Sequence, residues 1–287
     1  MTGNQHKLRH PAPADPEADP VVGPSRPRLL GILGPGLITG ASDDDPSGIA
    51  TYSQAGAQFG YGLSWTLLIT YPLMCAVQMI SARVGRTTGH GIAGILRRHY
   101  PNWLLQSLVF LLVVANTINL GADLGAMAEA FVLVVPGPPK WLLIVFFAAA
   151  CVYAQVFLQY TRYVAVLKWL TLALFAYFAA VMTTHVDAKA LSEGLFWPNI
   201  IWSQDYLTTV VAVFGITISP YLFFWQAAQE VEDIHAYRHR HRLTFAPQQG
   251  GAALRRIEID TLVGMAFSNL VALAIVITTA ATLHVNG

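Results

Sequence analysis

Long apolar runs separated by short polar segments form the main pattern of this chain. Seven of these runs reach the roughly 20 residues that a helix needs to cross a bilayer. They lie near residues 29–55, 61–82, 103–133, 141–158, 163–184, 206–230 and 260–284. The pattern predicts an all-α polytopic membrane protein. Residues 1–28 contain six prolines and almost no large apolar groups, so they are predicted to form a disordered tail.

The loops between the runs differ in charge, and the difference supports this division into spans. The tail and the loops after the second, fourth and sixth spans hold fifteen lysines and arginines, whereas the alternate loops hold only Lys140 and Lys189. Basic residues accumulate on the cytoplasmic side of membrane proteins. We therefore expect a multi-pass protein of the plasma or inner membrane with a cytoplasmic N-terminus.

Composition narrows the function classes further. The 287 residues are 54% hydrophobic and only 11% charged, whereas a soluble domain carries roughly 25% charged residues. The net charge of +1 argues against a nucleic-acid partner, which would require a basic surface. Membrane lipid is the expected surrounding of the chain, and no oligomeric state is predicted.

Acidic residues interrupt the first apolar run. Asp43, Asp44 and Asp45 stand in sequence and are followed by Pro46 and Gly48. Carboxylates at bilayer depth are costly unless they line a wet cavity or hold a cation. A proline breaks the helix and frees backbone carbonyls, which are further ligands for a cation. This segment predicts a cation site at a broken helix.

A second interruption lies in the sixth run, at Pro220. A proline there removes one helical hydrogen bond and crowds the carbonyl of Ile216, which then needs a cation or water as its partner. A simple proline kink is the alternative. The two breaks are five spans apart, which is the distance between matching members of two five-helix inverted repeats. We therefore expect an inverted-repeat, LeuT-like transporter domain over residues 29–285, with a first repeat over 29–184 and a partial second repeat over 206–285.

The segments around the two breaks resemble helices of the Nramp divalent-metal transporters. ASDDDPSGIATYSQAGAQFGYGLSW resembles their first helix, whose signature is Asp-Pro-Gly-Asn, and GITISPYLFFWQAAQEVED resembles their sixth, whose signature is Met-Pro-His-Asn. The resemblance covers roughly residues 29–285. It places the metal-binding aspartate of the family on Asp45 and its motif proline on Pro46. It also implies two main-chain carbonyl ligands, at Ser42 and Ile216.

Three positions depart from the motifs of the family. The asparagine ligand falls on Gly48, the methionine ligand on Ser219 and the motif histidine on Tyr221. A thioether favours softer ions such as Mn²⁺, whereas a hydroxyl is a hard ligand. A roomier site built from oxygen atoms suits Mg²⁺, which gives up its water reluctantly. The chain thus resembles the Nramp-related magnesium transporters, and we expect Mg²⁺ as the transported ion, followed by Mn²⁺.

Other acidic residues leave more than one interpretation. Asp123 matches the aspartate that proton-coupled members use in their proton path, but the glutamate that follows it there is Ala126 here. With Tyr221 in place of the histidine, we expect weak or absent proton coupling, and Asp123 has structural pairing as its alternative role. Asp43 and Asp44 either attract cations and hold ordered water in a vestibule or cap the second half of the broken helix.

The end of the sixth span carries a further acidic group. Glu230, Glu232 and Asp233 lie close together there. They are interpreted as a solvated helix end, with an acidic exit for the cation as the alternative.

Three rival functions follow from the same sequence. An intramembrane prenyltransferase would need a second acidic cluster and basic residues near the breaks, which are absent, so no enzymatic activity and no cofactor is expected. An amino-acid transporter of the same fold is opposed by the three aspartates, which would repel a substrate carboxylate. The family has ten or more helices, and this chain ends after the seventh, so a truncated remnant without transport is the third alternative.

Overall fold

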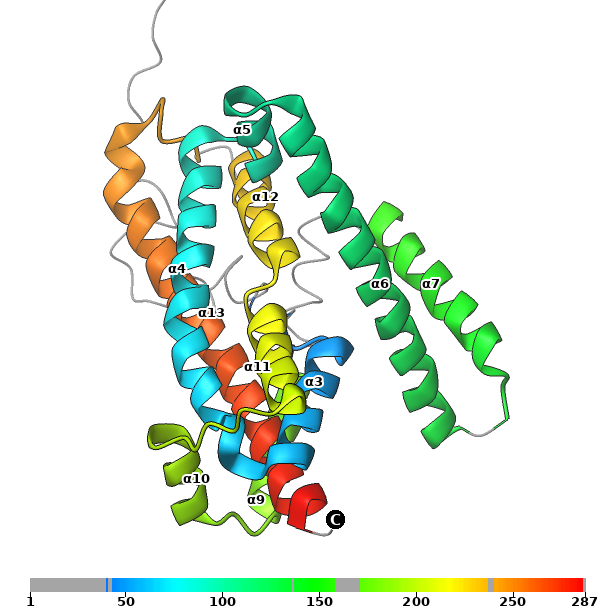
Figure 1. Ribbon diagram of the computed structural model, residues 1–287. Helices are drawn as coiled ribbons and strands as arrows, with labels where there is room; N and C mark the ends of the chain where they lie inside the picture. The colour runs from blue at the N-terminus through cyan, green and yellow to red at the C-terminus, as the bar shows by residue number, and fades with distance from the viewer. Residues whose placement is uncertain (1–39, 41–42, 136, 158–170, 237–239, 286–287) are drawn as a thin grey trace, which may run out of the picture.

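The computed structural model describes residues 40, 43–135, 137–157, 171–236 and 240–285, and this part of the chain is helical with no strand (Figure 1). The predicted tail over residues 1–28 and the carbonyl ligand predicted at Ser42 lie outside the described residues. The main helices are α3 (Pro46–Phe59), α4 (Ser64–Thr88), α5 (Ile92–His99), α6 (Asn102–Val134), α7 (Lys140–Phe157), α9 (Phe175–Thr183), α10 (Ala188–Phe196), α11 (Gln204–Thr217), α12 (Pro220–Ala236) and α13 (Gly250–Thr279).

Five stretches of the described chain are long and apolar enough to cross a membrane. They are Pro46–Thr88, Asn102–Val134, Lys140–Phe157, Gln204–Ala236 and Pro247–His284. The first of them contains both α3 and α4, which meet at a short 3-10 turn over Gly60–Leu63. A π-helical turn over Ala280–His284 ends the last.

The predicted spans and the observed helices differ mainly at the polar ends. Helices α6 and α7 agree with the predicted spans to within one residue, but α4 continues past residue 82 to Thr88 and α13 begins at Gly250 rather than near 260. Both extensions pack against the rest of the protein, with Arg86 and Ile257 buried. Helices continue beyond the apolar run here because tertiary packing supports them.

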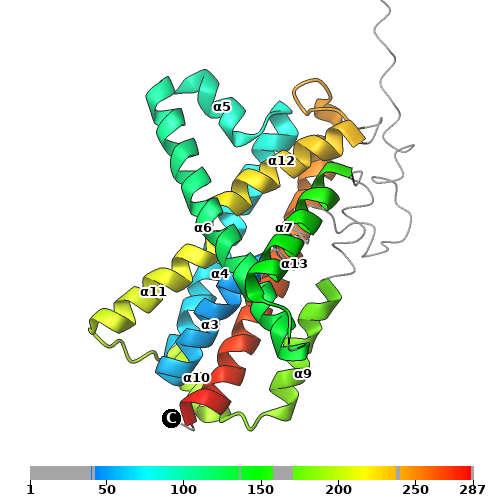
Figure 2. The same cartoon turned by 90° about the vertical axis from the view of Figure 1, so that its right-hand side faces the viewer.

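The core forms where α3 packs between α11 and α13, and α4 packs against α12 and α13 (Figures 1 and 2). Tyr52 and Leu67 are buried with Tyr206 of α11 and Ile275 of α13. Helices α4 and α12 approach closely at Gly85, where a Cβ atom would clash with the backbone carbonyl of Ala227. This bundle holds both breaks in its interior.

Helices α6 and α7 form a hairpin that leans away from the bundle (Figure 1). Ala128 is the only buried residue of α6, and Leu143 the only buried residue of α7. Large apolar side chains such as Phe110, Ile118 and Phe146 are exposed along the pair. A helix that is apolar on all sides and still exposed is typical of a lipid-facing span.

Charged residues gather at one end of the molecule. The end of α4, α5, the end of α12 and the start of α13 meet at the top of Figure 1. These segments and the loop before α13 hold every arginine that the structure describes, namely Arg83, Arg86, Arg97, Arg98, Arg240, Arg242, Arg255 and Arg256. Lys140 and Lys189 belong to the starts of α7 and α10, at the opposite end.

Candidate metal centre

The first helix break lies at the aspartates. Residues 40 and 43 are helical, Asp44 and Asp45 are not, and α3 begins at Pro46. Asp45 is the N-cap residue with extended backbone, and its Oδ1 accepts hydrogen bonds from the Gly48 N–H at 2.8 Å and the Ser47 hydroxyl at 2.6 Å. Proline at the first helical position fits this cap, since its missing N–H is not needed there. The local sequence therefore ends one helix and starts the next.

The second break lies between α11 and α12, at Ile218 and Ser219 (Figure 1). Pro220 has no N–H to donate to the Ile216 carbonyl, so the helical bonding pattern stops there. At the start of α12, the Leu222 N–H donates a hydrogen bond to the Ser219 carbonyl at 3.2 Å. The Ser219 side chain is buried at this junction.

Two hydrogen bonds join the breaks. The Tyr221 hydroxyl donates to Asp45 Oδ2 at 2.9 Å, which links the starts of α12 and α3. About two turns farther along α3, the hydroxyl groups of Tyr52 and Thr217 are 3.1 Å apart. Thr217 donates its own hydrogen to the Val213 carbonyl at 2.6 Å, so Tyr52 is the donor of the pair. Both oxygens of the Asp45 carboxylate are thus engaged at the junction.

Asp43 and Asp44 are held differently, on the side of the break that faces α13. Their side chains are 2% and 6% exposed. The Ser268 hydroxyl of α13 donates to Asp43 Oδ2 at 2.9 Å. Asp43 Oδ1 and both oxygens of Asp44 have no hydrogen-bond partner among the described residues. Within the described part of the chain, neither lysine nor arginine forms an ion pair with either carboxylate.

Asp123 reaches the same region from α6. Its carboxylate lies near the Ser47 backbone N–H and within electrostatic range of Asp45. Its Oδ1 is buried and has no hydrogen-bond partner among the residues that the structure covers. This placement gives the otherwise lipid-facing α6 a polar contact with the start of α3.

The structure thus brings most of the predicted site residues to one region. Asp45, Gly48 and Tyr221 are directly connected, and Asp123 lies beside them. Ile216 lies in the last turn of α11 and packs against the apolar core, and Ser219 lies at the second break. In the described ranges, no group of three or more His, Cys, Asp or Glu side chains is arranged to hold a metal ion. A cation here would therefore need hydroxyl, carbonyl or water oxygens in addition to carboxylates.

The capping interpretation of Asp43 and Asp44 is wrong, because Asp45 occupies the cap position of α3. Sequence reasoning also missed Ser268, the hydroxyl that binds Asp43. The signal available for it was the polar pair Ser268 and Asn269 in the middle of a long apolar run. Nothing local to that pair identifies its partner, which is 225 residues away in the chain.

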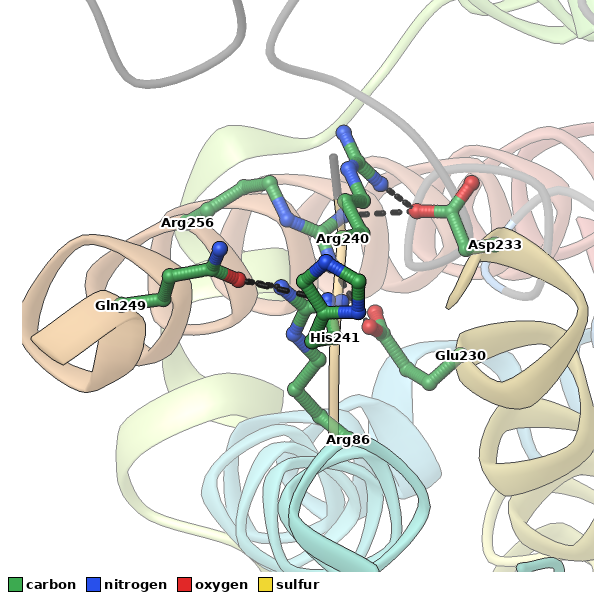
Figure 3. Close-up of polar contacts among 7 residues, drawn as sticks. All are labelled: Arg86, Glu230, Asp233, Arg240, His241, Gln249 and Arg256. Carbon is green, nitrogen blue, oxygen red and sulfur yellow. Dashed lines mark hydrogen bonds and ion pairs between the residues drawn. The ribbon is translucent and has the colours of Figure 1, made fainter. Parts of the chain in front are cut away.

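A second polar cluster occupies the arginine-rich end of the bundle (Figure 3). Arg256 of α13 contacts Glu230 at 2.5 Å and Asp233 at 3.6 Å, and Arg240 pairs with Asp233. Glu230 is fully buried and Asp233 is 7% exposed. The prediction of a solvated helix end is therefore wrong for these two acids. The arginines of other segments neutralise them, so they do not form an open acidic exit in this structure.

Comparison with known protein families gives a match over residues 36–287 to the family described as natural resistance-associated macrophage protein-like. Among curated proteins, the chain is 26% identical over 271 residues to the divalent metal cation transporter MntH of Chromohalobacter salexigens, covering 92% of this chain and 60% of that protein. It is 26% identical over 213 residues to the metal transporter NRAT1 of Oryza sativa subsp. japonica, covering 72% of this chain and 38% of that protein. The chain thus spans about 60% or less of the length of these relatives.

Among solved structures, the chain is similar to the manganese transporter of Eremococcus coleocola in complex with an aromatic bis-isothiourea substituted compound. That likeness has a TM-score of 0.74 and 20% identity, and it covers 88% of this chain and 52% of the other. A mutant of the same transporter aligns with a TM-score of 0.75 and 19% identity over 94% of this chain and 54% of the other. The likeness confirms the predicted fold, an inverted-repeat, LeuT-like helical architecture with two broken helices.

Proposed function

The chain belongs to the Nramp family, and on that premise we propose that it carries a divalent metal cation across a membrane by alternating access. The observation that supports this most directly is the junction of the two breaks at Asp45. A carboxylate between two interrupted helices, with backbone carbonyls nearby, is the arrangement in which membrane transporters hold small cations. The relatives, which are divalent metal and manganese transporters, support the same substrate class.

Asp45 is the proposed principal ligand. It supplies the negative charge, and the carbonyls of Ser42 and Ile216 and the Ser219 hydroxyl supply neutral oxygen atoms. In the structure, Asp45 Oδ1 accepts two hydrogen bonds at the cap of α3 and Oδ2 accepts one from Tyr221, so an ion that binds Asp45 directly would use the second lone pair of Oδ2 and compete with the Tyr221 hydrogen bond. An ion that keeps part of its water shell can instead be bound through that water.

Mg²⁺ is the proposed cargo, with Mn²⁺ as the next candidate. Gly48 provides no side-chain ligand, and a Cβ atom at this position would lie 3.0 Å from the Asp43 carbonyl oxygen. An asparagine would therefore require the backbone to shift. Ser219 provides a hard oxygen where the family has a thioether. Mg²⁺ is usually bound by one or two carboxylates with several retained waters, which fits a site of this composition.

We further propose that the arginine-rich end faces the cytoplasm, which would also place the N-terminus there, in a plasma or inner membrane. The distribution of positive charge supports this orientation, since all arginines that the structure describes lie at that end. An amino-acid substrate is disfavoured because Asp43, Asp44 and Asp45 would repel its carboxylate. The relatives are transporters, and no enzymatic role is proposed.

Reconstitution of the 287-residue chain into liposomes tests the proposal. We expect uptake of Mg²⁺, reported by an entrapped indicator, and loss of that uptake in Asp45→Ala. Wild-type protein that binds neither Mg²⁺ nor Mn²⁺ would overturn the proposed substrate class. Binding without uptake would identify a chain that holds the ion but does not move it, and uptake by a longer version that matches the full length of the relatives would then attribute the difference to the added part.

A further inference from the structure

Asp43 and Asp44 are the most deeply buried carboxylates at the first break. Both lie within the lipid-spanning bundle, with side chains 2% and 6% exposed. Ser268 occupies Asp43 Oδ2, which leaves Asp43 Oδ1 and both Asp44 oxygens without a hydrogen-bond partner among the described residues. Buried carboxylates without partners are rare, because each has lost its water without receiving donors in return.

These oxygens face a different part of the bundle from Asp45. Asp45 Oδ2 accepts a hydrogen bond from Tyr221 of α12, whereas Asp43 Oδ2 accepts one from Ser268 of α13. The Asp44 carboxylate lies near the Ser268 hydroxyl as well, and within electrostatic range of Tyr177 on α9. The run of aspartates therefore presents two separate groups of oxygens, one between α3 and α12 and one beside α13.

We propose that Asp43 and Asp44, together with the Ser268 hydroxyl, form a second binding site for a hard divalent cation. This inference rests on the proposed function, because the ion would be the transported one. Two carboxylates balance the charge of one Mg²⁺, and a hydroxyl and retained water complete its oxygen shell. Ser268 is 1% exposed and its hydroxyl is already directed at Asp43, so α13 contributes to the site as well as the first break.

The second site is adjacent to Asp45 in the chain, so an ion bound at one site weakens the binding of an ion at the other. Two divalent ions bound at adjacent residues repel each other, and this repulsion makes binding of the second ion at least about tenfold weaker than binding of the first. We therefore expect two binding events of unequal affinity. The arrangement would let an ion wait beside α13 until the Asp45 position is vacant.

Calorimetric titration of the full chain in detergent with MnCl₂, and separately with MgCl₂, tests this inference. The wild-type protein should show two binding events. The double variant Asp43→Asn/Asp44→Asn should lose one of them and keep the other, whereas the matched control Asp45→Asn should lose the complementary event. Ser268→Ala should weaken only the event that the double variant removes.

Thermal unfolding supplies a second measurement that does not depend on calorimetric resolution. Asparagine keeps the size of aspartate but removes its charge, so the double variant should melt at a higher temperature than wild type in EDTA. The rise in melting temperature caused by MgCl₂ should be smaller in the double variant than in wild type.

The outcomes separate this inference from the proposed function. A double variant that keeps both events, or a wild type with a single event that Asp45→Asn abolishes, would overturn the second site while leaving the proposed function intact. A wild type without any binding event would overturn both. A lower melting temperature of the double variant in EDTA would show that Asp43 and Asp44 serve packing, and would also count against the site.

Discussion

Tyr221 donates its hydroxyl hydrogen to Asp45 Oδ2 across the two helix breaks, at 2.9 Å. The two residues are 176 positions apart in the chain, and each lies within one residue of a proline that starts a helix. The bond fixes the start of α12 against the start of α3. It also places a competing donor on Oδ2, the Asp45 oxygen that has fewer hydrogen bonds and is therefore more available to a cation.

Tyr221→Phe should tighten metal binding by about tenfold. The phenol hydrogen bond stabilises the metal-free carboxylate, and a hydrogen bond to a charged group contributes about 1.5–3 kcal/mol. That hydrogen bond competes with a cation for the electron density of Asp45 Oδ2, so its removal should favour direct coordination. Titration calorimetry with MgCl₂ measures the change. Weaker binding in the variant would contradict this view and would indicate that the hydroxyl holds the ion or its water.

Ser219→Met should shift the site toward softer ions. A thioether at the second break adds a ligand that favours Mn²⁺ and Cd²⁺ over Mg²⁺, and we expect the ratio of their affinities to change by about tenfold. Methionine is flexible enough to be accommodated at this buried position. The control is Ser219→Ala, which removes the hydroxyl without adding sulfur. Equal ion preferences in the two variants would reject Ser219 as a determinant of selectivity.

Arg256→Ala should destabilise the folded chain by about 3 kcal/mol. The substitution removes the arginine that contacts Glu230 at 2.5 Å and leaves that fully buried carboxylate without its closest cation. Thermal unfolding in detergent measures the effect. Arg255→Ala is the matched control, because Arg255 is the neighbouring residue on the exposed side of α13, and its change should stay within about 0.5 kcal/mol.

Glu230→Gln introduced into Arg256→Ala should restore part of the lost stability, since it removes the uncompensated charge. Equal melting temperatures of Arg256→Ala and Arg255→Ala would contradict the prediction. They would show that the ion pair of Arg256 with Glu230 stabilises the fold no more than an exposed arginine does. Figure 3 shows why the pair matters to the fold: Arg256 lies between Glu230 and Asp233, so it connects α13 to two turns of α12.

The sequence was sufficient for features that arise locally. Pro46 and Pro220 act on their own helices, so both breaks were predictable from the residue types alone. The choice of Asp45 as the cap depends on the backbone conformation after Asp44, which composition does not specify. The same holds for Glu230, whose neutralising arginine comes from a different helix 26 residues away. The environment of a residue such as Glu230 depends on contacts between segments that are distant in sequence, and the pattern of a single sequence does not specify those contacts.

Proton coupling is expected to be weak or absent. The residue that faces Asp45 is Tyr221, and a phenol holds its proton at neutral pH, so it cannot accept one from the site. Ala126 has no titratable group, and within the described residues the remaining acceptor near Asp45 on α6 is Asp123. Liposomes loaded with a pH-sensitive dye should therefore show Mg²⁺ uptake without acidification of the lumen.

The control is Asp123→Asn, which should leave the rate of Mg²⁺ uptake independent of an imposed pH gradient, as in the wild-type chain. Acidification that follows Mg²⁺ uptake in the wild type and disappears in Asp123→Asn would contradict the expectation. It would show that a single carboxylate beside Ser47 carries the proton without the histidine and glutamate that this chain lacks. The geometry argues against that outcome, because the residue that faces Asp45 from α12 is the phenol of Tyr221, which is not a base, rather than a histidine.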